Sequence, residues 1–341
     1  MHELDLRKFS EDGGFVSLCY HYIQSNSKRY PYKLLGTYRD DFALHVKWAR
    51  KAFRQLSTSE VSEYEYSGGC SNGVGMIFTF DDGLSDHVAA GEILADAGIS
   101  GLFFVPTCLL TDNLPPNPTV IHYGLAAYGL DRFLKAYRHA LESNRLSVDR
   151  YDIHYSKGKT DPWGAIRAIK KRTKYDLNHK DSREVLMHIY RDLLLKDNES
   201  ILSQMHMSEH EVRRLLAMGH RVGTHSHTHL SVAASDLNRE DFYREIIKPR
   251  KILERLLGTH INTLAYPFGG KNDCFSESQL CPEQSGYDFA FTVEPKLNTE
   301  KTNQFSFGRY MPTSKDTIET INGILSKMIL SQGANVSFEA N

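Results

Sequence analysis

The stretch Gly75-Met76-Ile77-Phe78-Thr79-Phe80-Asp81-Asp82-Gly83 decides the fold class of this chain. Its first part is a short apolar run, which predicts a buried strand, and two adjacent carboxylates follow directly. Residues 86–97 then repeat apolar side chains at helical spacing, and Gly98 supplies a stop signal before a second apolar run at 101–106. Strand, helix and strand in this order predict a parallel βαβ unit.

The same alternation continues on both sides of this unit, so parallel strands with helical crossovers are expected. Further strands are predicted at 15–22, 220–224, 263–267 and 289–293. A capping box at Ser208-Glu209-His210-Glu211 predicts a helix that ends at Gly219, and Pro249 should kink or split the helix that follows. Residues 111–207 are less regular and are interpreted as a helical insertion, and residues 333–341 as a mobile tail.

Composition excludes several classes of function. The 341 residues include 41 Lys and Arg against 42 Asp and Glu, so no global basic field exists to bind nucleic acid or an acidic membrane. No apolar run approaches the length of a membrane span, and the N-terminus does not resemble a secretory signal. The five cysteines form no C-x-x-C pair and are expected to be reduced thiols. Together these features predict a cytoplasmic protein, and they leave the oligomeric state open.

Asp81 and Asp82 are the first candidates for chemistry. They follow a predicted strand, and barrel enzymes collect their catalytic groups at the carboxyl ends of their strands. In a metal site one carboxylate can bind the ion while its neighbour accepts a proton from water. An ordinary Asp-Asp-Gly turn is the alternative interpretation.

A histidine cluster follows a second predicted strand, in Thr224-His225-Ser226-His227-Thr228-His229. Two imidazoles spaced by four, joined by a carboxylate from elsewhere, supply three metal ligands and leave a position for water. A solvated histidine-rich loop is the alternative, and the residues alone do not exclude His227 as a ligand. The corner Tyr266-Pro267-Phe268-Gly269-Gly270 brings backbone N–H groups and an aromatic wall near a substrate, or is a plain turn.

These segments, in this order, resemble the polysaccharide deacetylase family, carbohydrate esterase family four. Thr79-Phe80-Asp81-Asp82-Gly83 is similar to its first motif, His225-Ser226-x-x-His229 to its second and Tyr266-Pro267-Phe268-Gly269 to the tail of its third. The resemblance implies an α/β fold, a distorted (β/α) barrel forming a single domain over residues 1–341 with the helical insertion at about 111–207. It also implies that Asp82, His225 and His229 bind the metal, that Asp81 is the general base and that His227 is in the second shell.

The chain departs from the family pattern at two places. Ala265-Tyr266 stands where many members have an Arg, and Arg309, near the expected last strand, is a candidate to replace it or to contact the substrate. A late Leu-x-His, the usual source of the general acid, is also missing. Tyr20-His21 resembles instead the early Tyr-His of biofilm-polysaccharide deacetylases, which makes His21 the candidate acid; a buried structural ring is the alternative.

The expected function is metal-dependent hydrolysis that removes an N-acetyl or other N-acyl group from an amino sugar or glycoside. This substrate is expected to be a precursor in surface-glycan biosynthesis. One divalent ion is expected, Zn²⁺ first, although Co²⁺ or Ni²⁺ suits the same ligands. Tyr266, Pro267, Phe268 and Gly269 are expected to contact the substrate or the oxyanion. The alternatives are hydrolysis of another non-peptide C–N bond, such as a formamide, ureide or imide, and an inactive carbohydrate-binding relative.

Overall fold

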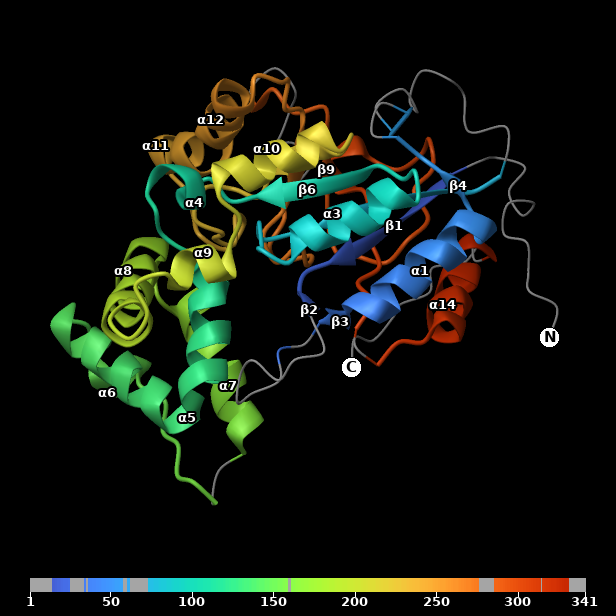
Figure 1. The fold of residues 1–341 in the computed structure, drawn as a ribbon. Coiled ribbons are helices and arrows are strands. Elements are labelled where there is room, and N and C mark those ends of the chain that lie inside the picture. Colours follow the sequence, from blue (N-terminus) through green and yellow to red (C-terminus); the bar gives the residue numbers. More distant parts are fainter. Residues whose placement is uncertain are drawn as a thin grey trace.

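The computed structural model describes residues 14–24, 34, 36–57, 60–61, 73–158, 161–275, 285–313 and 315–330. Its centre is a curved parallel sheet, surrounded by helices (Figure 1). The sheet has the order β1-β5-β6-β7-β8-β9, and β4 pairs with the beginning of β5. The strands are β1 (Phe15–Tyr20), β4 (Arg54–Gln55), β5 (Gly75–Phe80), β6 (Gly101–Val105), β7 (Arg221–Thr224), β8 (Thr263–Ala265) and β9 (Phe289–Phe291).

A short segment after β9 joins the two ends of the sheet. Phe307 bridges to Phe291 of β9, and Tyr310 bridges to Leu18 of β1, both in parallel orientation. The amide of Cys19 donates to the carbonyl of Tyr310 at 2.8 Å, which ties this segment to the first strand. The sheet is therefore a distorted (β/α) barrel, as the motifs predicted.

The predicted strand β5 is confirmed, and so are the five other predicted parallel strands. Each of these five begins and ends within two residues of its predicted bounds. They were recognisable because buried parallel strands are short apolar runs bounded by turn residues. The strand predicted at 15–22 ends at Tyr20, and a separate two-stranded sheet follows, of β2 (Ile23–Gln24) and β3 (Thr37–Tyr38).

Side chains alternate between the two faces of each strand, and this alternation positions the site. Phe78 and Phe80 pack outward into the core under the helices, whereas Ile77 packs into a separate cluster with Phe104 and Phe291. Because the period of a strand is two, Thr79 and the position of Asp81 share the face of Ile77. The outer helices are α1 (Arg39–Ala52), α3 (His87–Asp96), α10 (Glu209–Ala217), α12 (Lys248–Leu257) and α14 (Ile318–Leu330).

The helix boundaries follow local signals in the sequence. Ser208 accepts from the amide of Glu211 while the Glu211 carboxylate accepts from the amide of Ser208, so the predicted capping box is confirmed. Pro249 lies in the first turn of α12, directly after α11 (Arg239–Phe242) and the π-helical η4 (Tyr243–Ile247). The helical run is therefore not split but continues from Arg239 to Leu257, and its π-helical turn η4 lies directly before the turn that contains Pro249.

The chain between β6 and β7 is mostly helical and has an apolar core of its own, beside the barrel (Figure 1). Gly129 interrupts the long α5 with a left-handed φ of 76°. The helical segments are α4 (Cys108–Thr111), α5 (Asn117–Ser143), α6 (Val148–Tyr151), α7 (Pro162–Lys171), η2 (Arg172–Asp176), α8 (His179–Ile189), η3 (Tyr190–Leu195) and α9 (Ile201–Met205). A short 3₁₀ turn, η5 (Gln304–Ser306), precedes the segment that closes the barrel.

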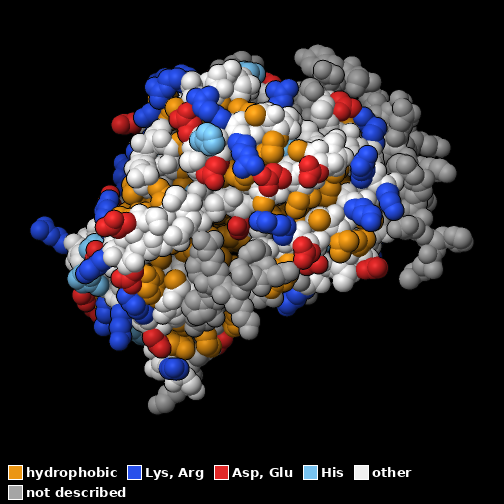
Figure 2. Space-filling view, in the orientation of Figure 1, with side chains coloured by type: hydrophobic (Ala, Val, Ile, Leu, Met, Phe, Trp, Pro, Cys, Tyr) orange, Lys and Arg blue, Asp and Glu red, His pale blue; other side chains and the backbone are white. Residues whose placement is uncertain are grey.

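Charge is mixed on the surface of the molecule. Figure 2 shows positive and negative side chains interspersed over the visible face, in agreement with the net charge of −1. None of the helices within the described ranges combines the length and the apolar character needed to cross a membrane. Cys19, Cys108 and Cys274 are free thiols, whereas Cys70, Cys281 and the tail predicted at 333–341 lie outside the described residues.

Candidate active site

Asp81 and Asp82 lie at the carboxyl end of β5 and are both buried, at 1% and 2% exposure. Asp82 has a φ of 78°, a left-handed conformation that non-glycine residues seldom adopt, and Gly83 follows with a φ of 60°. Strict alternation would point Asp82 to the face opposite Asp81, but this turn breaks the alternation, so both carboxylates lie near the same histidines. A strained backbone at such a position is typical of functional sites.

Asp81 forms a two-pronged ion pair with Arg309. The Nη1 and Nη2 atoms of Arg309 each donate to one carboxylate oxygen at 2.7 Å, while Nε donates to the carbonyl of Thr292 at 2.8 Å. Burial alone would raise the pKa of Asp81, but the Arg309 guanidinium outweighs it and holds that pKa well below its usual range. The carboxylate is therefore ionised and fixed in orientation.

Arg309 thus takes the place of the Arg that is missing ahead of Pro267. It comes from the segment that closes the barrel and is fully buried, with 0% exposure. Its donors bond to Asp81, Thr79 and Thr292, and it does not line the cavity described below, so a contact between Arg309 and the substrate stays a prediction.

Asp82 lies against two of the three clustered histidines. Its Oδ1 atom is 3.4 Å from Nε2 of His225 and 3.0 Å from Nε2 of His229. The Nδ1 atom of His225 bonds to the carbonyl of Ala265 at 2.8 Å, which directs Nε2 toward Asp82. Burial would raise the pKa of Asp82, but the neighbouring His229 outweighs this effect, and the pKa lies well below its usual range.

These three side chains fit a divalent metal ion. One ligand atom from each of Asp82, His225 and His229 lies within 4.8 Å of the others, and all three residues are buried. The contacts between Asp82 and the two imidazoles lack hydrogen-bond geometry, so the buried Oδ1 of Asp82 and Nε2 of His225 form no hydrogen bond, which is costly unless a further group satisfies them. Two imidazoles and one carboxylate form the donor set of an open zinc-type site.

His227 lies apart from this set. Its Nδ1 atom is 2.9 Å from the hydroxyl of Thr107, and its Nε2 atom is 3.0 Å from the carboxylate of Asp112, both in the connection after β6. A strand would have placed His227 on the same face as His225 and His229. Ser226, however, has a φ of 58°, and this left-handed residue ends the alternation.

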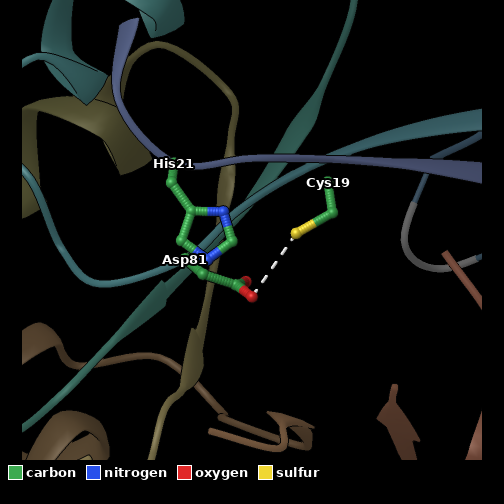
Figure 3. A group of neighbouring side chains, drawn as sticks. All are labelled: Cys19, His21 and Asp81. Carbon is green, nitrogen blue, oxygen red and sulfur yellow. Dashed lines mark hydrogen bonds between the residues drawn. The ribbon is translucent and has the colours of Figure 1, made fainter. Parts of the chain in front are cut away.

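His21 lies beside the Asp81 carboxylate, on the wall of the cavity. Figure 3 shows its ring extending toward Asp81, and the thiol of Cys19 on the same carboxylate. The Cys19 Sγ donates to Asp81 at 3.4 Å, and burial raises the pKa of this thiol, so it remains protonated. The Nδ1 atom of His21 is buried without a hydrogen-bond partner.

Cys19 is a residue that the sequence reasoning missed. Its signal was positional: Cys19 is opposite Thr79 in the parallel register of β1 and β5, on the face of the sheet that carries Asp81.

The third motif supplies an aromatic wall. Phe268 has a φ of 63° and packs edge-on against His229, with ring centroids 4.7 Å apart. Gly269 also has a positive φ, and a Cβ there would lie only 2.9 Å from Val293. Tyr266 is buried at 1% exposure and Phe268 lines the cavity, so of these two aromatic residues only Phe268 faces the site.

A cavity of about 410 Å³ opens over the site. The barrel contributes His21, Asp82, His229 and Phe268, and the helical segment contributes the opposite wall. A volume of this size falls within the range of small-molecule sites. A substrate held there would meet Asp82 and His229, the two candidate metal ligands that line the cavity.

Comparisons with known proteins agree with this arrangement. Residues 195–280, which include the second and third motifs, match the family model described as polysaccharide deacetylase. No curated protein sequence matches the chain significantly.

Solved structures share the whole fold at low identity. PplD, a Streptococcus pyogenes deacetylase solved in complex with acetate, aligns with a TM-score of 0.55 at 12% identity, over 93% of this chain and 97% of its own. IcaB from Ammonifex degensii gives 0.54 at 17% identity, over 92% and 97%. A de-N-acetylase from Aggregatibacter actinomycetemcomitans gives 0.53 at 13% identity, over 91% and 99%.

The chain thus resembles the polysaccharide deacetylase family over residues 195–280 and shares its fold with solved deacetylases, a class of hydrolases that act on carbon–nitrogen bonds other than peptide bonds. The family resemblance predicted from the motifs is therefore confirmed. The likeness of Tyr20-His21 to the biofilm-polysaccharide deacetylases stays a prediction.

Proposed function

We propose that the chain is a metal-dependent deacetylase that removes an N-acyl group from an amino sugar. One observation carries this proposal: Asp82 converges with His225 and His229 while the adjacent Asp81 is held by Arg309 and kept free of that set. The two carboxylates thus have the separate environments that a ligand and a proton acceptor need. The deacetylases among the similar structures support the choice of an acylated amine.

Each residue has a role in this scheme. Asp82, His225 and His229 would hold the ion, which would supply Lewis-acid polarisation of the amide carbonyl and lower the pKa of water. A carboxylate oxygen of Asp81 accepts a proton from the attacking water, and Arg309 keeps that oxygen in place. His21 donates a proton to the leaving amine through its ring, and Phe268 forms the apolar wall against which the sugar lies.

The finer assignments are also part of the proposal. We infer that the ion is Zn²⁺, that the acyl group is acetyl, and that the sugar is a precursor in surface-glycan biosynthesis located in the cytoplasm. Reduced thiols support this location, since Cys19 and Cys108 are buried and unpaired. Cell fractionation that finds the native protein outside the cell would contradict it.

Metal analysis and acetate release test the activity. Purified protein should contain about one divalent ion per chain, and His225→Ala combined with His229→Ala should abolish both binding and turnover. Asp81→Asn should lower turnover by about two to four orders of magnitude while the ion stays bound. Bound metal unchanged in the double histidine variant would place the ion elsewhere, and full activity of Asp81→Asn would remove the proposed base.

A further inference from the structure

The wall of the cavity opposite the metal ligands is basic. The helix α7 continues into η2, and four cations along this run line the cavity: Arg167, Lys170, Lys171 and Lys174. Residues three or four apart lie on one side of a helix, so the four form a single face. The wider π-helical turn of η2 also brings the consecutive residues Thr173, Lys174 and Tyr175 to the cavity.

Two of these cations have no acidic partner. Arg167 pairs with Asp161 at 3.0 Å, and Lys174 pairs with Asp273 at 2.8 Å. Within the part of the chain that the structure describes, neither Lys170 nor Lys171 forms an ion pair. Asp82 is the one carboxylate among the described residues that line the cavity. The wall therefore has positive charge in excess.

A structural role at a helix end does not explain these lysines. Lysines in the last turn of a helix usually compensate its dipole, but α7 has no free end at Lys171 because η2 continues the helical path to Asp176. Lys170 and Lys171 are both exposed, while partial burial by nearby protein atoms lowers the pKa of the Lys170 ammonium group.

Lys170 lines the same cavity as the candidate metal ligands Asp82 and His229. His122 lines the same cavity. Its pKa is lowered to about 3, mainly because the ring is buried and secondly because of the positive charge of Lys170. His21 and His229, two of the candidate catalytic groups, line this cavity together with His122 and Lys170. An anion bound at Lys170 would be close to a sugar whose amide lies at Asp82.

We propose that the substrate is a phosphorylated amino sugar, with its phosphate held by Lys170 and Lys171 while its N-acyl group lies at Asp82 and His229. This proposal rests on the proposed function. A phosphate ester carries a charge of about −1.5 to −2, which matches two unpaired ammonium groups. Lysine binds phosphate as a point charge, without the planar geometry that arginine requires. A neutral glycan would leave both exposed ammonium groups to water alone.

Turnover of matched substrates tests this proposal. N-acetylglucosamine 1-phosphate should have a kcat/KM at least about tenfold above that of methyl N-acetylglucosaminide, because hydrogen bonds to charged groups are strong. UDP-N-acetylglucosamine distinguishes a diphosphate source from a monoester. The double variant Lys170→Gln with Lys171→Gln should bring the ratio close to one. Lys135→Gln, an exposed lysine of α5 that does not line the cavity, should leave the ratio as in the wild type.

A binding measurement separates this proposal from the activity. Calorimetry with glucosamine 1-phosphate should give a Kd that rises about tenfold or more in the double lysine variant, with metal content unchanged, and that rises with salt. If the phosphate adds no affinity over glucosamine, or if the lysine variant binds as tightly as the wild type, the phosphate site is wrong even when deacetylation is intact. If no amide is hydrolysed yet these binding differences appear, the phosphate site stands and the proposed activity fails.

Discussion

Arg309 is the residue that gives Asp81 its geometry. Its planar guanidinium donates to both oxygens of the carboxylate, and a third donor anchors the side chain to the carbonyl of Thr292. An ammonium on a flexible stem offers no such fork. The two basic side chains are therefore not interchangeable here, although either would neutralise the charge of Asp81.

Arg309→Lys should lower kcat by about one to two orders of magnitude with metal content unchanged, since one charged hydrogen bond contributes about 1.5–3 kcal/mol. Steady-state kinetics and metal analysis check this, and thermal unfolding shows whether the variant is folded. The matched control is Arg213→Lys on the exposed side of α10. Unchanged kcat in Arg309→Lys would mean that Asp81 does not depend on the fork.

His21→Ala tests the donation of a proton to the leaving amine. Turnover of a sugar amide should fall while the ion stays bound, and the loss should shrink for an acylated aniline, whose less basic amine needs less protonation. His210→Ala, at an exposed position of α10, serves as the control. An equal loss on both substrates would show that His21 has a structural role, and the acid would then have to be another group.

Some residues of the site were predictable and others were not. Asp81, Asp82, His225 and His229 follow strands, so their convergence at one edge of the sheet follows from parallel topology. The partnership of Arg309 with Asp81 spans 228 residues of sequence and depends on how the barrel closes, which local patterns do not encode. The position of His227 depends on the left-handed conformation of Ser226, which cannot be predicted from the presence of a serine.

At the scale of elements, α10 positions the histidine cluster. It begins at the capping box of Ser208 and Glu211, buries Val212 and Leu215, and leads through Gly219 into β7. Strand and helix boundaries of this kind were predictable because the capping and stop signals are local. The π-helical turn η2, which turns several side chains toward the cavity, has no comparable signal in the sequence.

Ser208→Ala should lower the free energy of unfolding by about 1 kcal/mol, because the amide of Glu211 loses its acceptor at the start of α10. The melting temperature measures this effect, and Ser208→Thr, which keeps a hydroxyl acceptor, should retain most of the stability. Catalytic constants should not change in either variant. An Ala variant as stable as the wild type would show that the cap contributes nothing in this fold.

At the scale of the whole molecule, the site depends on the closure of the barrel. β1 and β9 are joined through the segment of Phe307 and Tyr310, and this segment delivers Arg309 to the interior beneath Asp81. The helical segment between β6 and β7 then covers the open side of the site and forms the basic wall of the cavity. In the proposed function the barrel would supply the reactive groups, and the helical segment would contact the substrate from the other side of the cavity.

Metal binding should stabilise the whole molecule, because Asp82 and His225 come from the ends of β5 and β7 and an ion would cross-link them over β6. A ligand that binds only the folded state at one hundred times its Kd adds about 2.7 kcal/mol, so a chelator should lower the melting temperature by several degrees, and added Zn²⁺ should restore it. The variant His225→Ala with His229→Ala should melt at the same temperature with or without Zn²⁺, whereas His210→Ala should respond as the wild type does. If chelation strips the ion and leaves the melting temperature of the wild type unchanged, the ion does not bridge these two strands, and the ligand set of Asp82, His225 and His229 must be reassigned.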